Sequence, residues 1–223
     1  MNPEKILANL TACYFDLESY ADVGTVNITP PATTVSFGTY FRSPTYFRMD
    51  WHDEKGADSN SVWCDGKASY ATYSWLGETL TFENIALAIA SSAAICEGIT
   101  TIIPPLLLDL GGARKITSFD QCKRSLDEIV DGKQCYCLEL MTGKTVTKLW
   151  VDVTDFTLRM FAEYVPDSLE DAIDALRRTG MSHRIPELLS ESDPDSFPDI
   201  ERLVKFNGIE LNKCISDDVF KGP

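Results

Sequence analysis

The sequence has few histidines and few basic residues. Its 223 residues include 2 histidines, and 20 lysines and arginines stand against 34 aspartates and glutamates, for a net charge of -14. Nucleic acids and anionic lipid surfaces attract clusters of Lys and Arg, so this charge argues against both as partners.

The short motifs that mark common catalytic and phosphate-binding sites are missing as well. There is no GxSxG nucleophile elbow, no GxxxxGK[ST] or GxGxxG loop and no HExxH pair. A metal site at the two histidines, His52 and His183, would need carboxylates brought in from elsewhere in the chain. We therefore expect no metal, no cofactor and no catalytic residue, and we predict that the protein is not an enzyme.

The seven cysteines include no CxxC pair, and their odd number leaves at least one thiol outside any intramolecular disulfide scheme. The closest spacing is Cys135-x-Cys137, which in a strand places both thiols on one face. Free cysteine behaves as a small buried hydrophobe, so we expect these side chains to fill apolar space rather than bind metal. Their pairing stays open.

Length and composition suit one domain, since 223 residues with 44% hydrophobic side chains can bury an ordinary core. The first ten residues lack the basic start and long apolar stretch of a secretory signal peptide. Two compartments stay open: the cytoplasm if Met1 is the native start, and the periplasm or cell envelope if a leader was removed.

One long apolar stretch, Ile85–Leu108, contains a single charged residue, Glu97. A membrane span needs roughly 20 consecutive apolar residues, whereas Glu97-Gly98 and Pro104-Pro105 interrupt this run, which makes a span the least favoured interpretation. Two others stay open. The stretch forms two short helices packed on a core, or it forms a mobile apolar lid over a cavity built by the flanking strands.

Hydrophobic periodicity predicts a first helix over 3–19, with Asn2 as its N-cap and an end near Tyr20, and a second helix over 168–179. Alternation and turn signals predict strands at 23–29, 34–41, 46–52, 61–64, 68–75, 123–130, 134–141, 145–153, 156–164 and 200–211. Within 148–152, Leu149 and Val151 should share one face, with Trp150 on the other.

This order of elements predicts an α+β fold. We expect one strongly curved antiparallel sheet with helices covering its concave apolar face. The whole chain, 1–223, forms a single domain in this prediction, with a helical and irregular excursion at about 166–199 before the last strand.

Aromatic side chains crowd both groups of predicted strands. They form either a core on one side of the sheet or the lining of an apolar cavity. A curved sheet with a lid as apolar as Ile85–Leu108 has more apolar surface than two layers comfortably bury, which favours the cavity.

Three blocks of the sequence resemble one family, the LolA/LppX-like lipoprotein and lipid carriers and their uncharacterised cell-envelope relatives. The first block, 38–75, pairs a basic residue near a proline with an aromatic-Arg strand and an Asp-Gly-Lys hairpin; the second is a later hairpin set, and the third is the tail. The matching residues are Arg42, Pro44, Phe47, Arg48, Asp65, Gly66 and Lys67, then Asp131, Gly132, Cys135, Tyr136, Leu149, Trp150, Asp152, Leu158 and Arg159, and finally Asn212, Ile215 and Phe220.

The resemblance implies that the curved sheet is an incomplete, unclosed β-barrel whose concave apolar face is covered by helices. It further implies that the stretch 85–108 is a lid and that the ligand is a lipid, an acyl chain or a lipoprotein anchor, carried without catalysis. It also implies Arg42 as a latch for the lid, although Ser43 separates Arg42 from Pro44, where the carriers have none between. The expected cavity and lid residues are Phe41, Phe47, Trp75, Ile85, Leu87, Ile89, Ile102, Ile103, Leu107 and Trp150. A lipoprotein or an envelope protein is a further expected partner, and the resemblance favours the periplasm or cell envelope as the compartment.

A second hypothesis uses the same fold differently. The chain would be an envelope sensor, regulator or interaction domain whose core is filled by side chains and which binds a protein rather than a lipid.

Overall fold

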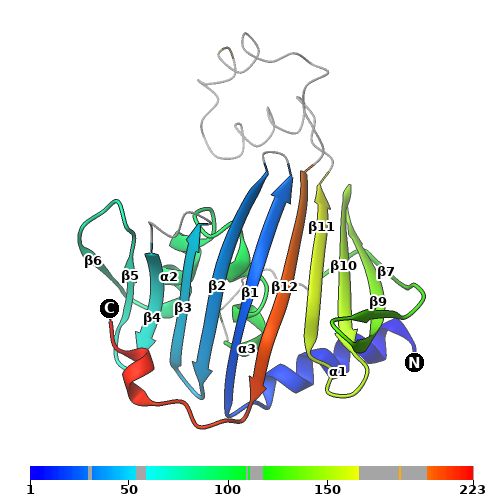
Figure 1. The fold of residues 1–223 in the computed structure, drawn as a ribbon, viewed down its shortest axis with the longest axis horizontal. Helices are drawn as coiled ribbons and strands as arrows, with labels where there is room; N and C mark the ends of the chain where they lie inside the picture. Colours follow the sequence, from blue (N-terminus) through cyan, green and yellow to red (C-terminus); the bar gives the residue numbers. More distant parts are fainter. Residues whose placement is uncertain are drawn as a thin grey trace.

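A curved antiparallel sheet organises the protein, as seen in a computed structural model (Figure 1). The structure describes residues 1–29, 32–53, 59–108, 110, 118–165, 186 and 200–222. The predicted helix at 168–179 and, apart from Pro186, the excursion at 166–199 lie outside these residues.

The 12-stranded sheet has the order β6-β5-β4-β3-β2-β1-β12-β11-β10-β9-β7, and β8 pairs with β9 off this path. Its strands are β1 (Ser19–Thr29), β2 (Thr33–Arg42), β3 (Tyr46–Asp53), β4 (Ser59–Asp65), β5 (Ser69–Thr72), β6 (Thr79–Phe82), β7 (Gln121–Arg124), β8 (Glu128–Val130), β9 (Lys133–Thr142), β10 (Thr145–Asp152), β11 (Leu158–Val165) and β12 (Ile200–Leu211). Among the described residues, β6 and β7 end the ladder without pairing with each other, so the barrel is incomplete and unclosed, as predicted.

Helices lie together on one side of this sheet (Figure 1). They are α1 (Pro3–Phe15), α2 (Ile85–Ser92), the 3₁₀ turn η1 (Ile99–Thr101) and α3 (Pro104–Leu107). Their buried side chains belong to the same apolar cluster as the inward side chains of the strands. The fold is therefore α+β, with its helices covering the concave apolar face.

The first helix begins as predicted and ends earlier than predicted. The Asn2 side chain accepts a hydrogen bond from the Lys5 main-chain N–H at 2.9 Å, which confirms the N-cap. The helix ends at Phe15 rather than near Tyr20, and β1 already begins at Ser19. Tyr20 pairs with strands on both of its sides, and this tertiary pairing outweighs the local helical pattern.

Side-chain alternation across the sheet agrees with the sequence. Leu149 and Val151 lie in the main core, whereas Trp150 packs in a separate cluster on the other face. Cys135 and Cys137 share that second cluster, so both thiols lie on one face as predicted. All seven cysteines are free thiols.

Two local predictions were wrong. The strand predicted over 123–130 is divided into β7 and β8, and residues 125–127 between them belong to neither strand; the Arg124 guanidinium pairs with the Asp127 carboxylate across this break at 2.7 Å. The strand predicted over 68–75 ends at Thr72, and the short strand β6 follows it. Within the described part of the chain, no helix has the length and apolar character needed to cross a membrane.

Candidate ligand-binding site

The apolar stretch 85–108, hereafter the lid, folds as short helical pieces. Asn84 caps α2 by accepting a hydrogen bond from the Leu87 main-chain N–H at 3.0 Å. Glu97 and Gly98, with φ of 53° and 73°, reverse the chain before η1. The residues that interrupt the apolar run thus divide the lid into separate pieces, as their sequence predicted.

The lid faces the sheet almost entirely through apolar side chains. Its buried members pack in one cluster with the inward side chains of β2, β3, β10 and β12. Ile99, Ile102 and Ile103 are at most 1% exposed. The hydrophobic effect therefore dominates the attachment of the lid to the sheet.

Most of the expected cavity residues meet in this cluster. Phe41 and Phe47 come from the sheet, and the members from the lid are Ile85, Ile89, Ile102, Ile103 and Leu107; Ile85 is partly buried and the others are buried. Three residues lie elsewhere: Leu87 is 49% exposed, Trp75 is 60% exposed, and Trp150 lies on the opposite face, where its Nε1 donates to Glu128 at 2.9 Å.

Arg42, the expected latch, contacts a different part of the chain. Its Nη1 donates to the Ile215 carbonyl at 3.2 Å and to the Asp217 carboxylate at 2.5 Å, and its guanidinium lies over the Tyr46 ring. None of these contacts of Arg42 is with a described residue of the lid.

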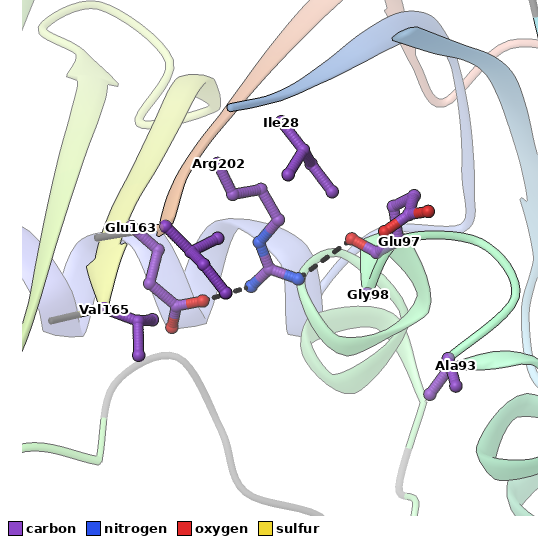
Figure 2. Close-up of a pocket in the computed structure, with 9 residues that line it drawn as sticks. Ile28, Ala93, Glu97, Gly98, Glu163, Val165 and Arg202 are labelled. Atoms are coloured by element: carbon purple, nitrogen blue, oxygen red, sulfur yellow. Dashed lines mark hydrogen bonds and ion pairs between the residues drawn. The ribbon is translucent and has the colours of Figure 1, made fainter. Parts of the chain in front are cut away.

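The lid is contacted instead by Arg202, a residue that the sequence did not single out. Nη1 of Arg202 donates to the Glu97 carbonyl at 3.0 Å, and Nη2 pairs with the Glu163 carboxylate at 2.7 Å (Figure 2). The guanidinium also lies 5.3 Å from the centre of the Phe161 ring. A Cβ at position 98 would collide with Arg202 Nη1, so the lid turn needs Gly98 for this close approach as well as for its φ.

The strand register explains why Arg202 reaches the lid. In β12, Arg202 alternates in step with the core residues Val204 and Phe206, so its side chain lies on the concave face. Its ladder neighbours are Glu163 in β11 and Ile28 in β1. The alternation of Arg202 with Val204 and Phe206 in the sequence is the pattern that indicates an arginine on the concave face.

A pocket of about 300 Å³ lies where the lid meets the strand ends. Figure 2 shows Arg202 at its centre, between Glu163 and the lid turn. The pocket is lined by Ile28, Ala93, Ala94, Glu97, Gly98, Glu163, Val165, Ile200 and Arg202. Small apolar side chains around a few convergent polar groups are typical of small-molecule sites, whose volumes are roughly 300–1,000 Å³.

The described residues contain no cluster of side chains that fits a metal ion. No group of three or more His, Cys, Asp or Glu there is arranged to hold a metal ion. The buried carboxylate Asp22 is already hydrogen-bonded, since it accepts from the Tyr20 hydroxyl at 2.7 Å and from the Thr39 main-chain N–H at 3.1 Å.

In a comparison with known proteins, the chain is similar to solved structures with which it shares little sequence identity. A LolA superfamily protein from Nitrosomonas europaea has 11% identity and a TM-score of 0.39, with 100% of this chain and 98% of that chain covered. LprF from Mycobacterium bovis has 10% identity and a TM-score of 0.46, with 99% and 96% covered. MucB has 11% identity and a TM-score of 0.47; 99% of this chain matches 62% of that one.

LolA superfamily members are thus among the structures that this chain is similar to, as the sequence resemblance implied. No protein-family model and no curated protein matches the chain.

Proposed function

We propose that this protein binds a hydrophobic ligand, such as a lipid, an acyl chain or a lipoprotein anchor, between the curved sheet and the lid, without catalysis. One observation carries the proposal: a pocket of about 300 Å³ at the point where the lid meets the sheet, lined by both apolar and charged side chains, with Arg202 bridging the lid and the sheet. The pocket lies beside the apolar cluster that would have to part to admit an acyl chain.

The lid has few polar attachments to the sheet in the described residues. Besides the bond from Arg202 to Glu97, the Tyr73 hydroxyl bonds with the hydroxyls of Ser91 and Ser92 at 2.9 and 3.0 Å. Net hydrogen-bond contributions are about 1 kcal/mol each, so these bonds orient the lid more than they hold it. Displaced lid side chains can be replaced by ligand methylenes of equal hydrophobicity, which keeps the opened state accessible.

Filling the pocket tests the proposal. Ala93 lines the pocket from the lid, and Ala93→Trp should reduce uptake of a fluorescent acyl probe at least about tenfold, because the indole occupies the entry. Leu87→Trp is the matched control, since Leu87 belongs to the same lid but is 49% exposed. Equal uptake by both variants, with the thermal unfolding of each intact, would count against the pocket as the entry.

One observation favours the second candidate, an envelope regulator or interaction domain on the same fold. The lid isoleucines Ile99, Ile102 and Ile103 already occupy the core at 1% exposure or less. If those side chains fill the interior permanently, neither the wild-type protein nor Leu87→Trp should take up the probe.

A further inference from the structure

The C-terminal segment, Ile215–Gly222, lies across the face of the sheet opposite the lid. Tyr46 and Arg48 of β3 alternate with Phe47 and Met49, which belong to the core on the lid side, so the segment covers the outer face. Figure 1 shows the segment passing along the ends of the strands to reach β4. Its helical turn η3 (Asp217–Phe220) packs on β3 and β4.

Two arginines of the outer face bind this segment through its main chain. Arg42 Nη1 donates to the Ile215 carbonyl at 3.2 Å, and Arg48 Nη1 donates to the carbonyls of Val219 and Lys221 at 3.2 and 2.6 Å. Because these bonds go to backbone oxygens, they recognise a chain in this conformation and depend little on its side chains.

Side chains of the segment add two specific contacts. The Asp217 carboxylate pairs with Arg42, and Phe220 is 1% exposed with its ring centre 5.4 Å from that of Tyr46. Trp63 forms the far wall, where a Cβ at Gly222 would lie 2.9 Å from the indole. Asp217 and Phe220 lie three positions apart; the aspartate pairs with a guanidinium, and the phenylalanine packs against the aromatic ring of Tyr46.

The charged residues of the outer face that contact the C-terminal segment suit an acidic chain. Arg42 and Arg48 face the segment in a chain whose net charge is -14. The neighbouring acid Asp50 is already bound by Arg48 Nε at 2.8 Å, and Lys221 pairs with Asp218 within the segment. Arg42 is therefore paired with the segment's own carboxylate, which an acidic peptide from another protein would replace with the same chemistry.

We infer that this surface of the outer face, formed by Arg42, Tyr46, Arg48 and Trp63, is a docking site for a protein segment carrying an aspartate three residues before a phenylalanine, and that the C-terminal segment occupies it in cis. The site lies on the opposite face from the lid, and the inference is independent of the proposed lipid binding. A tethered segment competes at an effective concentration in the millimolar range, so a partner binds well only after the tether is weakened.

The test uses the full chain and a labelled peptide with the sequence of residues 215–223. Asp217→Ala with Phe220→Ala weakens the occupant in cis, and fluorescence anisotropy should then show the peptide binding at least about tenfold tighter than to the wild-type protein. Replacing the peptide's phenylalanine by alanine, or adding Arg48→Met to the protein, should remove that gain. Circular dichroism and thermal unfolding check that each variant is folded.

Asp217→Ala alone provides a second variant, because that side chain is 75% exposed and its loss leaves the core intact. It should give a smaller gain in the same direction. The inference is overturned if the peptide fails to bind either folded variant at about 1 mM, or if it binds equally well after its phenylalanine is removed.

Discussion

Arg202 of the last strand donates from Nη1 to the main-chain carbonyl of Glu97, 105 residues earlier in the chain, at 3.0 Å. This bond ties the sheet to the turn at which the lid reverses direction. Glu163 holds the other side of the same guanidinium at 2.7 Å, so the ion pair sets the position of Arg202 at the pocket.

Replacing Arg202 by methionine should loosen the lid. The apolar stem is retained, the bond to Glu97 is lost, and Glu163 loses its partner at a site where it is 26% exposed. We expect a loss of about 1–3 kcal/mol in unfolding free energy and faster amide exchange within 93–103, measured by hydrogen–deuterium exchange mass spectrometry. Arg42→Met should leave lid exchange unchanged, and a lid that exchanges at the wild-type rate in Arg202→Met would contradict this role.

The lid turn should be sensitive to a single methyl group at Gly98. Gly98→Ala adds backbone strain at a φ of 73° and a collision with Arg202, for an expected loss of roughly 2–3 kcal/mol in unfolding free energy. Gly77 is the matched control: its φ is 68°, but a Cβ there has nothing within 4 Å, so Gly77→Ala should cost only about 1 kcal/mol. Equal losses in urea denaturation would show that the close approach of Arg202 is unimportant.

Stability should fall with rising pH because of Asp22. Burial raises the pKa of this carboxyl from 3.8 to about 6, although hydrogen bonds from Tyr20 and Thr39 oppose the rise. The folded state therefore binds the proton more tightly than the unfolded state. The contribution of Asp22 to the free energy of unfolding is fully present below pH 4. It is lost as the pH rises through 6, and the total loss is up to about 3 kcal/mol.

Urea denaturation between pH 4 and pH 8 measures this contribution as the difference between the wild-type protein and Asp22→Asn. The amide does not titrate in this range and keeps an oxygen acceptor for the Thr39 N–H, so the variant should lack this part of the pH dependence. Parallel curves for the two proteins would rule out Asp22 as the group responsible.

Four of the cysteines should resist alkylation because their thiols have a raised pKa. Burial raises the pKa of Cys13, Cys122, Cys135 and Cys137 from 9.0 to about 11, which leaves about one thiolate in a thousand at pH 8. Cys214 is exposed, and iodoacetamide should modify it first in the native protein. Peptide mass spectrometry after a short exposure tests this, and rapid labelling of Cys135 or Cys137 would mean that β9 opens readily.

Sequence patterns predicted the features of the fold that depend on residues close together in the chain. The alternation around Trp150 correctly separated Leu149 and Val151 from Trp150 onto opposite faces of the sheet, and β12 occupies 200–211 as expected. The Asn2 cap was also readable, because capping depends on residues within one helical turn.

Features that depend on contacts between residues far apart in the chain could not be predicted from sequence patterns. Arg202 gains its role from Glu97 and Glu163, far apart in sequence, and Arg42 was assigned to the lid although it contacts the C-terminal segment. Phe220 lies in a tail that gave no secondary-structure signal on its own, yet it is buried against Tyr46. Such contacts depend on tertiary packing that periodicity does not encode.

Native mass spectrometry of the purified protein, followed by organic extraction, would show whether a hydrophobic ligand binds between the lid and the sheet. We expect a stoichiometric lipid or fatty-acid adduct on the wild-type protein that is lost in Ala93→Trp and kept in Leu87→Trp. A clean mass without adduct, together with no uptake of a fluorescent acyl probe, would contradict the proposed binding and favour the interaction domain with a filled core.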